Sequence, residues 1–480
     1  MDYEAVIGLE VHVQVRTNTK MFCACANDFG GEPNTRICPV CMGYPGVMPV
    51  MNREAVRKTI VAGLMCGCDI AEYSKFDRKS YYYPDMPKNY QISQYDLPIC
   101  EHGGIPISGT GFSGEPLPDK TIGLTRIHLE EDVAKSIHHG SFSVIDFNRA
   151  GVPLMEAVSE PDMRSPDEAY AYLTGLKQIM QYAGVGDCDM EKGQMRCDVN
   201  VSVRPKGETK LGTKIEIKNL NSFRAVHRSL VYEIERQIDA VENGEPLTQE
   251  TRRWNDEAGY TTVMRTKEQA HDYRYFPEPD LLPLTISDDW KNEIRTTLPE
   301  TPRARRERFV ADFDVTEYDA EVLTQEKRLA DYFEAAATGA AKPKLVANWI
   351  ISELLRELNE RGISLDECPA TPENLRKMVD LMADGTISSK IAKTVFADMM
   401  ETGDEPEVIV ERKGLKQVSD SGELEGYVQE AIDGNPDVVA DYKAGKKKSI
   451  QFFVGQVMKK TRGKANPQMV IQILKDKLDG

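Results

Sequence analysis

Four cysteines near the start of the chain are spaced to bind a metal ion. They form two close pairs, Cys23 with Cys25 and Cys38 with Cys41. Zinc prefers four soft ligands in a tetrahedron, and two close pairs on facing turns supply them at the usual spacing. The alternative, a redox CxxC motif, lacks a surrounding βαβ pattern and has a second pair beside it. Because four thiolates leave no position for a substrate, we predict a structural zinc site.

A second group of side chains has the chemistry to hold a hard cation. Glu10 and His12, in the segment GLEVH, are two residues apart on a predicted strand, so both leave the same face of it. Taken alone, such a pair is more often ordinary surface. Two further segments, LTRIHLEED and VPLMEAVSEPD, add the carboxylates of Glu130, Glu131, Asp132, Glu156 and Glu160. If these strands adjoin, oxygen ligands with one histidine suit Mg²⁺ at a phosphate-handling site.

A third segment, KFDRKSYYYPDMPKNYQIS, alternates positive charge with aromatic rings. It carries Arg78, Lys79 and Lys88, together with tyrosines at positions 81, 82, 83 and 90. Such a segment can hold a nucleotide's phosphates and stack a base, or it can be a surface loop with packed tyrosines, and both interpretations stay open. GTGFSG matches GxGxxG by letter, but EPLPD follows where a helix should begin, and GxxxxGK[ST] does not occur.

Short alternating segments predict a sheet within residues 1 to about 290. In IGLEVHVQVR every second residue is apolar, and CDVNVSVRP and KIEIKN repeat the pattern. Strands of this kind have one buried and one polar face, and their sheets are usually antiparallel. Two predicted helices interrupt the region, at residues 165–184 and 222–244. Ser165 is the predicted cap of the first, with Pro166 in its first turn.

The pattern changes after the proline-spaced stretch YFPEPDLLPL. From about Trp290 to Thr402, apolar residues recur at helical spacing, which predicts an all-α domain. GDEPE, near Gly403, is a predicted linker, and short helices are predicted after it. We therefore expect an α+β protein. Its mainly antiparallel sheet domain would span residues 1–292, an all-α domain residues 293–403, and a small helical tail domain residues 404–480.

The distribution of charge restricts the kind of partner. A net charge of −17 argues against a protein whose whole surface binds nucleic acid. Positive charge is concentrated between Lys443 and Lys464, where KAGKKKSIQFFVGQVMKKTRGK contains no acidic residue. This basic segment predicts a polyanion as partner, although composition alone fits a solvated lysine-rich surface equally well.

The start of the chain, MDYEAVIGLEVHV, does not have the pattern of a signal peptide, and no apolar run approaches 18 residues. We therefore expect a cytoplasmic protein with no membrane segment. In a reducing compartment, the ten cysteines are expected to be metal ligands or free thiols rather than disulfides.

Motifs along almost the whole chain resemble, in order, those of one family: the B subunit of the bacterial-type aspartyl/glutamyl-tRNA amidotransferase. The matching segments are IGLEVHVQ, FCACANDFG with CPVCMGYPG, KFDRKSYYYPDMPKNYQISQ, LTRIHLEED, DFNRAGVPLMEAVSEPD, MRCDVNVSVRP, EIKNLNSF, DYRYFPEPDL, GQVMKK and ANPQMV. The resemblance implies a cradle-like catalytic domain, a helical domain and a small helical tail that contacts tRNA. The family includes members that lack the cysteines, which agrees with a structural rather than a catalytic role for the zinc.

The resemblance also implies a reaction and two cofactors, ATP and Mg²⁺. The side-chain carboxylate of Glu-tRNA(Gln) or Asp-tRNA(Asn) is phosphorylated, and ammonia then displaces phosphate to give Gln-tRNA or Asn-tRNA. The implied enzyme is a ligase that forms carbon–nitrogen bonds with glutamine as amido donor. A carboxylate is a poor acyl donor, so the acyl phosphate supplies the leaving group, and phosphoryl transfer depends on positioning and neutralised charge.

Site residues follow from the same resemblance. The expected magnesium ligands are His12, Glu131 and Glu156, with Glu10 beside them. Glu130 is the alternative to Glu131, because strand alternation places Glu130 on the face of His128. The residues expected to handle the nucleotide or acyl phosphate are Lys79, Lys88 and Asp198. Those expected to bind tRNA are Lys446, Lys447, Lys448, Lys459, Lys460, Arg462 and Lys464.

The source of ammonia is expected to lie outside this chain. The sequence shows neither a Gly/Ser-rich amidase segment nor a convincing Cys-His glutaminase set. The resemblance implies an amidase A subunit that supplies ammonia and a small C subunit. Two other classes stay under consideration: a non-catalytic RNA-binding scaffold, and an ATP-dependent ligase that acts on a free amino acid.

Overall fold

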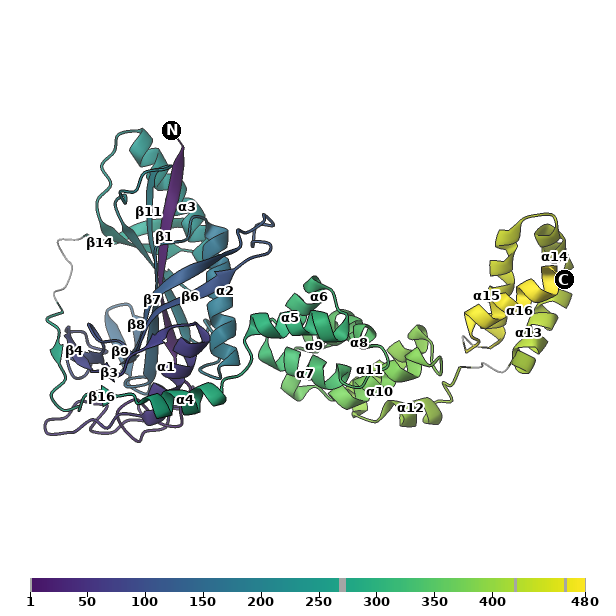
Figure 1. The fold of residues 1–480 in the computed structure, drawn as a ribbon, viewed down its shortest axis with the longest axis horizontal. Helices are drawn as coiled ribbons and strands as arrows, with labels where there is room; N and C mark the ends of the chain where they lie inside the picture. Colours follow the sequence, from purple (N-terminus) through teal and green to yellow (C-terminus); the bar gives the residue numbers. More distant parts are fainter. Residues whose placement is uncertain (1, 267–272, 418–420, 462–463, 480) are drawn as a thin grey trace. The chain divides into compact units, whose positions relative to one another are not determined.

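The computed structural model describes residues 2–266, 273–417, 421–461 and 464–479 (Figure 1). The chain divides into two compact units, Met1–Pro302 and Arg303–Gly480. The first unit combines sheet and helix and the second is helical, which confirms the predicted α+β class. The predicted boundary at residue 292 falls within helix α4 (Asp288–Thr296), which packs against α1 (Arg53–Met65) in the first unit.

A nine-stranded sheet forms the centre of the first unit. Its strand order is β14-β13-β12-β11-β1-β10-β7-β6-β2, and every neighbouring pair is antiparallel except β12 with β13. The mainly antiparallel sheet is therefore confirmed. The strands are β1 (Tyr3–Gln14), β2 (Asp69–Ile70), β6 (Cys100–Ile107), β7 (Lys120–Glu131), β10 (Pro153–Ser159), β11 (Met195–Pro205), β12 (Ile215–Leu220), β13 (Glu250–Asn255) and β14 (Tyr260–Thr266).

The alternation of β1 gives the sheet one covered and one open face. Leu9 and Val11 are fully buried, whereas Glu10 and His12 remain partly exposed. Helices α1, α2 (Pro166–Tyr182) and α3 (Phe223–Glu242) all contact the sheet, and α2 packs along α3 (Figure 1). Burying apolar residues under helices stabilises this face, so the polar residues of β1 are left on the open side.

The predicted helix starts are confirmed. The Ser165 side chain accepts a hydrogen bond from the backbone N–H of Glu168, and Pro166 occupies the first turn of α2. Ser222 caps α3 in the same way, accepting from the N–H of Ala225. Side-chain oxygens at these positions satisfy N–H groups that the first helical turn leaves unpaired.

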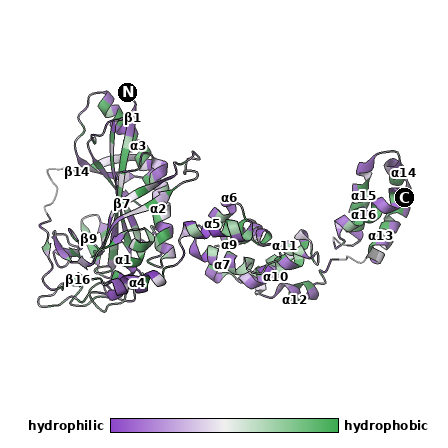
Figure 2. Cartoon of the chain, viewed as in Figure 1, coloured by the Kyte–Doolittle hydropathy of each residue, from purple (hydrophilic) through white to green (hydrophobic). Residues whose placement is uncertain are grey.

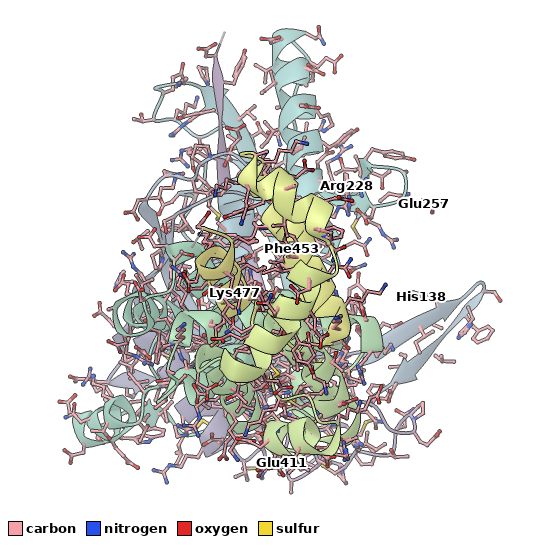
Figure 3. All side chains as sticks on the ribbon, turned by 90° about the vertical axis from the view of Figure 1, so that its right-hand side faces the viewer. His138, Arg228, Glu257, Glu411, Phe453 and Lys477 are labelled. Atoms are coloured by element: carbon pink, nitrogen blue, oxygen red, sulfur yellow. The ribbon has the colours of Figure 1, made fainter. Side chains whose placement is uncertain are left out.

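Small sheets border the open face. β4 (Asp77–Ser80) lies between β5 (Tyr90–Ser93) and β15 (Phe276–Pro277), and β3 (Tyr73–Ser74) pairs with β16 (Leu284–Thr285). The hairpin of β8 (Lys135–His139) and β9 (Phe142–Asp146) extends away from the large sheet near His138 (Figure 3). The segment with alternating charge and tyrosine thus contains β4 and β5, and its first strand, β4, lies beside β15 from much later in the chain.

The second unit contains helices that each carry hydrophobic and hydrophilic residues (Figure 2). Its longer helices in the first part are α5 (Pro302–Phe313), α7 (Lys327–Ala337), α10 (Pro372–Ala383) and α11 (Ser389–Thr402), and its shorter ones are α6 (Glu317–Leu323), α8 (Pro343–Trp349), α9 (Leu355–Arg361) and α12 (Pro406–Arg412). α12 packs against α10 and α11. The segment GDEPE near Gly403 therefore connects two packed helices.

The end of the chain has a hydrophobic core of its own. It is built by residues from Leu424 to Leu478, among which Phe453 is fully buried. The helices that contribute are α13 (Ser421–Asp433), α14 (Pro436–Lys443), α15 (Ile450–Lys460) and α16 (Pro467–Asp479). None of the helices in the described residues combines the length and hydropathy that a membrane span requires.

Candidate active site

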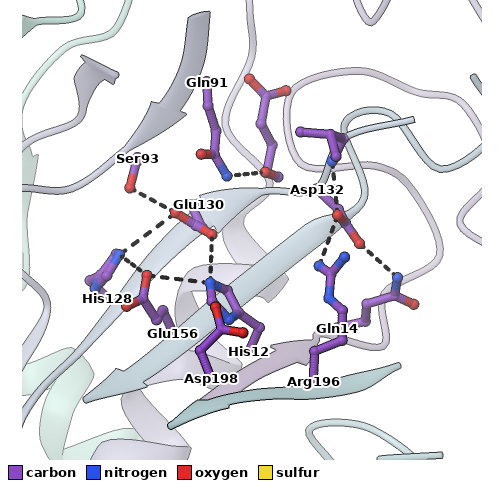
Figure 4. A network of polar contacts seen from close by, with 12 residues as sticks. His12, Gln14, Gln91, Ser93, His128, Glu130, Asp132, Glu156, Arg196 and Asp198 are labelled. Atoms are coloured by element: carbon purple, nitrogen blue, oxygen red, sulfur yellow. Dashed lines mark hydrogen bonds and ion pairs between the residues drawn. The ribbon is translucent and has the colours of Figure 1, made fainter. Parts of the chain in front are cut away.

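Strand register brings four titratable residues together on the open face of the sheet. His12 on β1 is the partner of Glu156 on β10, and Glu156 is the partner of His128 on β7. Paired residues of antiparallel strands project to the same face, and so does Glu130, two residues after His128. The side chains of His12, His128, Glu130 and Glu156 point toward one another (Figure 4).

The distances within this cluster suit a shared cation. His12 Nε2 lies 3.5 Å from a Glu156 carboxylate oxygen and 3.7 Å from one of Glu130. One ligand atom from each of these three residues lies within 4.8 Å of the others. His128 Nε2 lies 3.3 Å from Glu156 and 3.7 Å from Glu130. His128 therefore contacts both carboxylates as well as His12 does.

Burial and charge set the protonation states in this cluster. Burial alone would raise the pKa of Glu156, but the charges of His128 and His12 outweigh it and hold that pKa below its ordinary value of 4.5. Burial opposes the charged form of His12, yet the hydrogen bond to Glu156 and the charges of both glutamates raise its pKa above 6.5. Without a metal, the cluster therefore favours an imidazolium between two carboxylates.

Glu130, rather than Glu131, occupies the third position of the cluster. Glu131 accepts a hydrogen bond from the backbone N–H of Ile92, at 3.0 Å, and forms a buried ion pair with Lys88. Adjacent residues of a strand leave opposite faces, which is the pleat argument that favoured Glu130. The expected ligand Glu131 thus lies outside the cluster that His12, Glu130 and Glu156 form, and Glu130, the alternative, lies within it.

Glu10 and Asp198 lie beside the cluster rather than in it. They are cross-strand partners on β1 and β11. Glu10 accepts a hydrogen bond of 2.9 Å from the side chain of Asn200, and Asp198 forms an ion pair of 2.5 Å with Lys218. Both carboxylates thus have partners within the sheet, and Lys218 is the cation that Asp198 positions.

The two lysines expected to handle phosphate line different pockets. Lys79 lies in a pocket of about 630 Å³ together with Lys218, and it interacts electrostatically with Glu130 and Glu156. Lys88 lines a smaller pocket of about 240 Å³ with Arg78 and the cysteine loop. Burial opposes the charge on Lys79, but the carboxylates outweigh it and raise its pKa, so it carries positive charge beside the cluster.

Sequence reasoning left several supporting residues without a role. Ser93 donates a hydrogen bond of 2.9 Å to Glu130, and His128 contacts both glutamates. Beside them, buried Asp132 accepts from Gln14 and pairs with Arg196, each at 2.9 Å (Figure 4). The sequence did indicate His128, because strand alternation places it on the same face as Glu130. It did not indicate Ser93 or Arg196, because only tertiary pairing brings their strands to the site.

The four cysteines of the first motif meet in space. The sulfur atoms of Cys23, Cys25, Cys38 and Cys41 lie within 4.8 Å of one another. The backbone N–H of Cys38 donates to the Cys41 sulfur at 3.2 Å, and the ammonium of buried Lys20 lies 3.7 Å from the same sulfur. Four thiols at this separation could hold a tetrahedral metal ion.

Thiol acidity within this group is uneven. The hydrogen bond from Cys23, aided by the Cys38 N–H and the charge of Lys20, lowers the pKa of Cys41 to about 5. Burial and neighbouring thiols raise the pKa of Cys25 to about 11. A divalent soft cation supplies the charge that lets all four sulfurs bind as thiolates, so the donor set fits zinc.

The basic residues expected in the tail fall into two groups. Three of them pair with carboxylates of the same unit: Lys446 with Asp441, Lys447 with Asp479, and Lys460 with Glu430. Within the part of the chain that the structure describes, no carboxylate pairs with Lys448, Lys459 or Lys464. The expected residue Arg462 lies outside the described residues.

The fold and the cluster together define an α+β enzyme with a histidine–carboxylate centre on the open face of a mainly antiparallel sheet. Comparison with known families makes the assignment specific. The GatB/GatE catalytic domain matches residues 5–292, and the GatB domain matches residues 331–478.

Curated relatives match over the full length. The B subunit of the aspartyl/glutamyl-tRNA(Asn/Gln) amidotransferase of Carboxydothermus hydrogenoformans is 56% identical over 482 residues, covering 99% of each chain. The proteins of the same name from Thermoanaerobacter pseudethanolicus and Persephonella marina are 56% and 54% identical, covering 100% of each chain. The chain belongs to this family of amidotransferase B subunits. It is a subunit of a glutamine-dependent amidotransferase, a ligase that forms carbon–nitrogen bonds.

Proposed function

We propose that this chain uses ATP and Mg²⁺ to activate the side-chain carboxylate of Glu-tRNA(Gln) or Asp-tRNA(Asn), and then converts it to the amide. The observation that carries the proposal is the cluster of His12, Glu130 and Glu156 beside Lys79. The relatives at 56% identity are named for these two tRNAs, which supports the choice of substrate. We place the reaction in the cytoplasm.

The proposed reaction has two steps. The γ-phosphoryl group of ATP passes to a carboxylate oxygen of the substrate, which gives an acyl phosphate and ADP. The nitrogen of ammonia then attacks the acyl carbon, the carbon–oxygen bond to phosphate breaks, inorganic phosphate leaves, and the nitrogen loses a proton. A bound Mg²⁺ neutralises charge on the phosphoryl oxygens.

The residues of the chain have separate parts in this reaction. His12, Glu130 and Glu156 would hold the metal, and His128 fixes both carboxylates. Lys79 projects positive charge toward the cluster, and Lys218, held by Asp198, lines the same pocket. Fixed cations of this kind bind the transferring phosphoryl group without reorganising during the reaction.

Ammonia is supplied, in this proposal, by an amidase A subunit, and a small C subunit completes the assembly. The cysteine loop holds a structural zinc, and the tail domain binds tRNA. The test of the substrate is ATP hydrolysis by the assembled enzyme, measured with Glu-tRNA(Gln) and separately with Asp-tRNA(Asn). Hydrolysis that depends on either aminoacyl-tRNA supports the proposal, and hydrolysis that ignores both contradicts it.

The same proposal predicts how the chain behaves without the amidase. The purified chain should form the amide from free ammonium but not from glutamine, because the sequence has no glutaminase set. Amide formation from glutamine by the isolated chain would contradict the assignment of ammonia supply to a partner.

The two alternative classes make different predictions. A non-catalytic scaffold has no need to gather metal ligands, yet His12 Nε2 lies within 3.7 Å of both Glu130 and Glu156. A ligase for a free amino acid would not need the tail. Because α12 packs on α10 and α11, the informative deletion removes residues 421–480 and spares that helix. If ATP-dependent amide formation is unchanged after this deletion, a ligase that acts on a free amino acid would be favoured.

A further inference from the structure

Five tyrosines form a continuous row of rings along the border of the proposed active site. The row, in spatial order, is Tyr83, Tyr81, Tyr273, Tyr275 and Tyr95. Consecutive ring centroids lie 6.4, 6.3, 6.2 and 4.3 Å apart. We call this set the tyrosine row.

The row is assembled from three segments of the chain, one of them far along the chain from the other two. Tyr81 and Tyr83 follow β4, and Tyr95 follows β5. Tyr273 and Tyr275 precede β15, which pairs with β4. The backbone N–H of Ser80 donates to the carbonyl oxygen of Tyr273 at 2.8 Å, which fixes this segment along β4. The row therefore exists only in the folded protein.

Both ends of the row are open to solvent. Tyr83 is 56% exposed and Tyr95 is 57% exposed, whereas Tyr81, Tyr273 and Tyr275 are half-buried. Tyr95 and Tyr275 stack face to face at an interplanar angle of 11°. Tyrosines that served only as packing would be expected to bury their rings, so exposed rings that continue a stacked series are suited to a flat ligand.

The row borders the pocket lined by Lys79 and Lys218, the two lysines proposed to bind the transferring phosphoryl group. Tyr81, Tyr83 and Tyr273 line the pocket of about 630 Å³ together with Lys79 and Lys218. The ammonium of Lys79 lies 4.9 Å from the ring centre of Tyr273. Aromatic rings next to lysines match the chemistry of a single-stranded nucleic acid, which offers bases for stacking and phosphates for charge.

We propose that the tyrosine row stacks the unpaired 3′-terminal nucleotides of the aminoacyl-tRNA and guides its aminoacyl ester into the pocket beside His12, Glu130 and Glu156. This inference rests on the proposed function, because the amino acid is esterified to the last nucleotide of that RNA. Stacking is tolerant of sequence, so one row serves tRNAs with different bodies. It favours base stacking over a packed surface loop as the role of the tyrosine-rich segment.

The first test is equilibrium binding of two RNAs, intact tRNA and the same tRNA without its unpaired 3′ end. For the full-length chain with its partner subunits, removing the 3′ end should weaken binding roughly 5- to 100-fold, the scale of stacking on aromatic rings. Tyr95→Ala should weaken binding of intact tRNA and reduce the difference between the two RNAs. Tyr95→Phe, which keeps the ring, should retain that difference.

Controls separate stacking from a loss of structure. Tyr318 is 70% exposed in the helical unit, so Tyr318→Ala serves as the matched control and should bind both RNAs as the unchanged protein does. If Tyr95→Ala lowers the melting temperature, Tyr83→Ala at the opposite end of the row replaces it. If removal of the 3′ end weakens binding equally for the unchanged protein, for Tyr95→Ala and for Tyr83→Ala, the proposal is overturned.

The second test distinguishes the bases of tRNA from the adenine of ATP. Tyr95→Ala should raise the KM for aminoacyl-tRNA in the amidation assay and leave the KM for ATP unchanged. A rise confined to the KM for ATP would overturn the proposal. An unchanged protein that shows no ATP-dependent amidation would instead contradict the proposed function, and the binding comparison, which requires no turnover, would still decide the role of the row.

Discussion

Glu130 and Glu131 are adjacent in the chain, yet their carboxylates have different partners. Glu130 faces His12 and His128 at 3.7 Å, whereas Glu131 pairs with Lys88 at the edge of the cysteine loop pocket. The end of β7 thus contributes one carboxylate to the candidate metal centre and one to an internal ion pair. Isosteric substitutions at the two positions should therefore have different consequences.

Glu130→Gln should weaken Mn²⁺ binding at least about tenfold, because it removes a charge that faces the metal. Glu131→Gln should leave Mn²⁺ binding within about threefold of the unchanged protein. It should instead lower stability by about 3–5 kcal/mol, since it leaves the buried Lys88 ammonium without its counter-ion. Metal titration and thermal unfolding of both variants check this, and a reversed pattern would restore Glu131 as the ligand.

Glu156→Gln should reduce phosphorylation by orders of magnitude and leave the fold intact. Glu156 contacts both His12 and His128, so the substitution removes a negative charge from the centre of the cluster. The measurements are ATP hydrolysis in the presence of aminoacyl-tRNA and the circular dichroism spectrum. Near-normal ATP turnover would remove Glu156 from the ligand set.

Metal binding should become tighter as pH rises through the pKa of His12. That pKa lies above 6.5, so near neutrality the imidazole holds a proton that the metal must displace. Calorimetric titration with Mn²⁺ in buffers of different ionisation enthalpy should show proton release. In His12→Gln, binding should be weaker and proton release should disappear. Proton release that persists in this variant would assign it to another group.

In the metal-free protein, the stabilisation contributed by His12 should decrease as pH rises, whereas metal affinity increases. The raised pKa of His12 gives a contribution that is complete below 6.5 and is lost as pH rises through the folded value. The lowered pKa of Glu156 gives a contribution that is present above 4.5 and is lost as pH falls through the folded value. Melting temperatures of metal-free protein should therefore show this contribution to be largest between these limits.

Cys38→Ser should lower zinc content and melting temperature more than it alters the residual turnover of folded protein. Its sulfur lies within 4.8 Å of three others, a set of four thiols that could complete tetrahedral zinc coordination, and its N–H donates to the Cys41 sulfur. Cys368→Ser, in the helical unit, is the matched control and should leave zinc content unchanged. Full zinc content in Cys38→Ser would contradict the four-cysteine site.

Lysines that have no carboxylate partner within the described part of the chain should dominate the binding of tRNA by the tail. Replacing Lys448, Lys459 and Lys464 with glutamine should weaken binding. It should also reduce the slope of log affinity against log salt by about one for each phosphate that the protein no longer neutralises.

The matched triple replaces the paired lysines Lys446, Lys447 and Lys460. This variant should change the slope less, because these ammonium groups already have counter-ions. Equal effects of the two triples on the slope would show that pairing within the tail is irrelevant to RNA binding.

The amino-acid sequence by itself determined the features that depend on neighbours along the chain. The alternation in β1 predicted which residues face the open side, and Ser165 predicted the start of α2. The spacing of the cysteines predicted that Cys23 and Cys41 meet, because short loops restrict where their ends can lie. Motifs along the chain likewise indicated the family to which the full-length comparisons assign it.

Tertiary structure alone decided which side chains from different strands meet. Alternation along β7 placed Glu130 on the face of His128, but a shift of one residue in register between strands moves every side chain to the other face, so the observed pairing of β7 with β10 was needed to bring Glu130 to Glu156. The stacking of Tyr275 on Tyr95 depends in the same way on β15 joining β4. Such pairings join segments far apart in the chain, and local sequence does not encode their alignment.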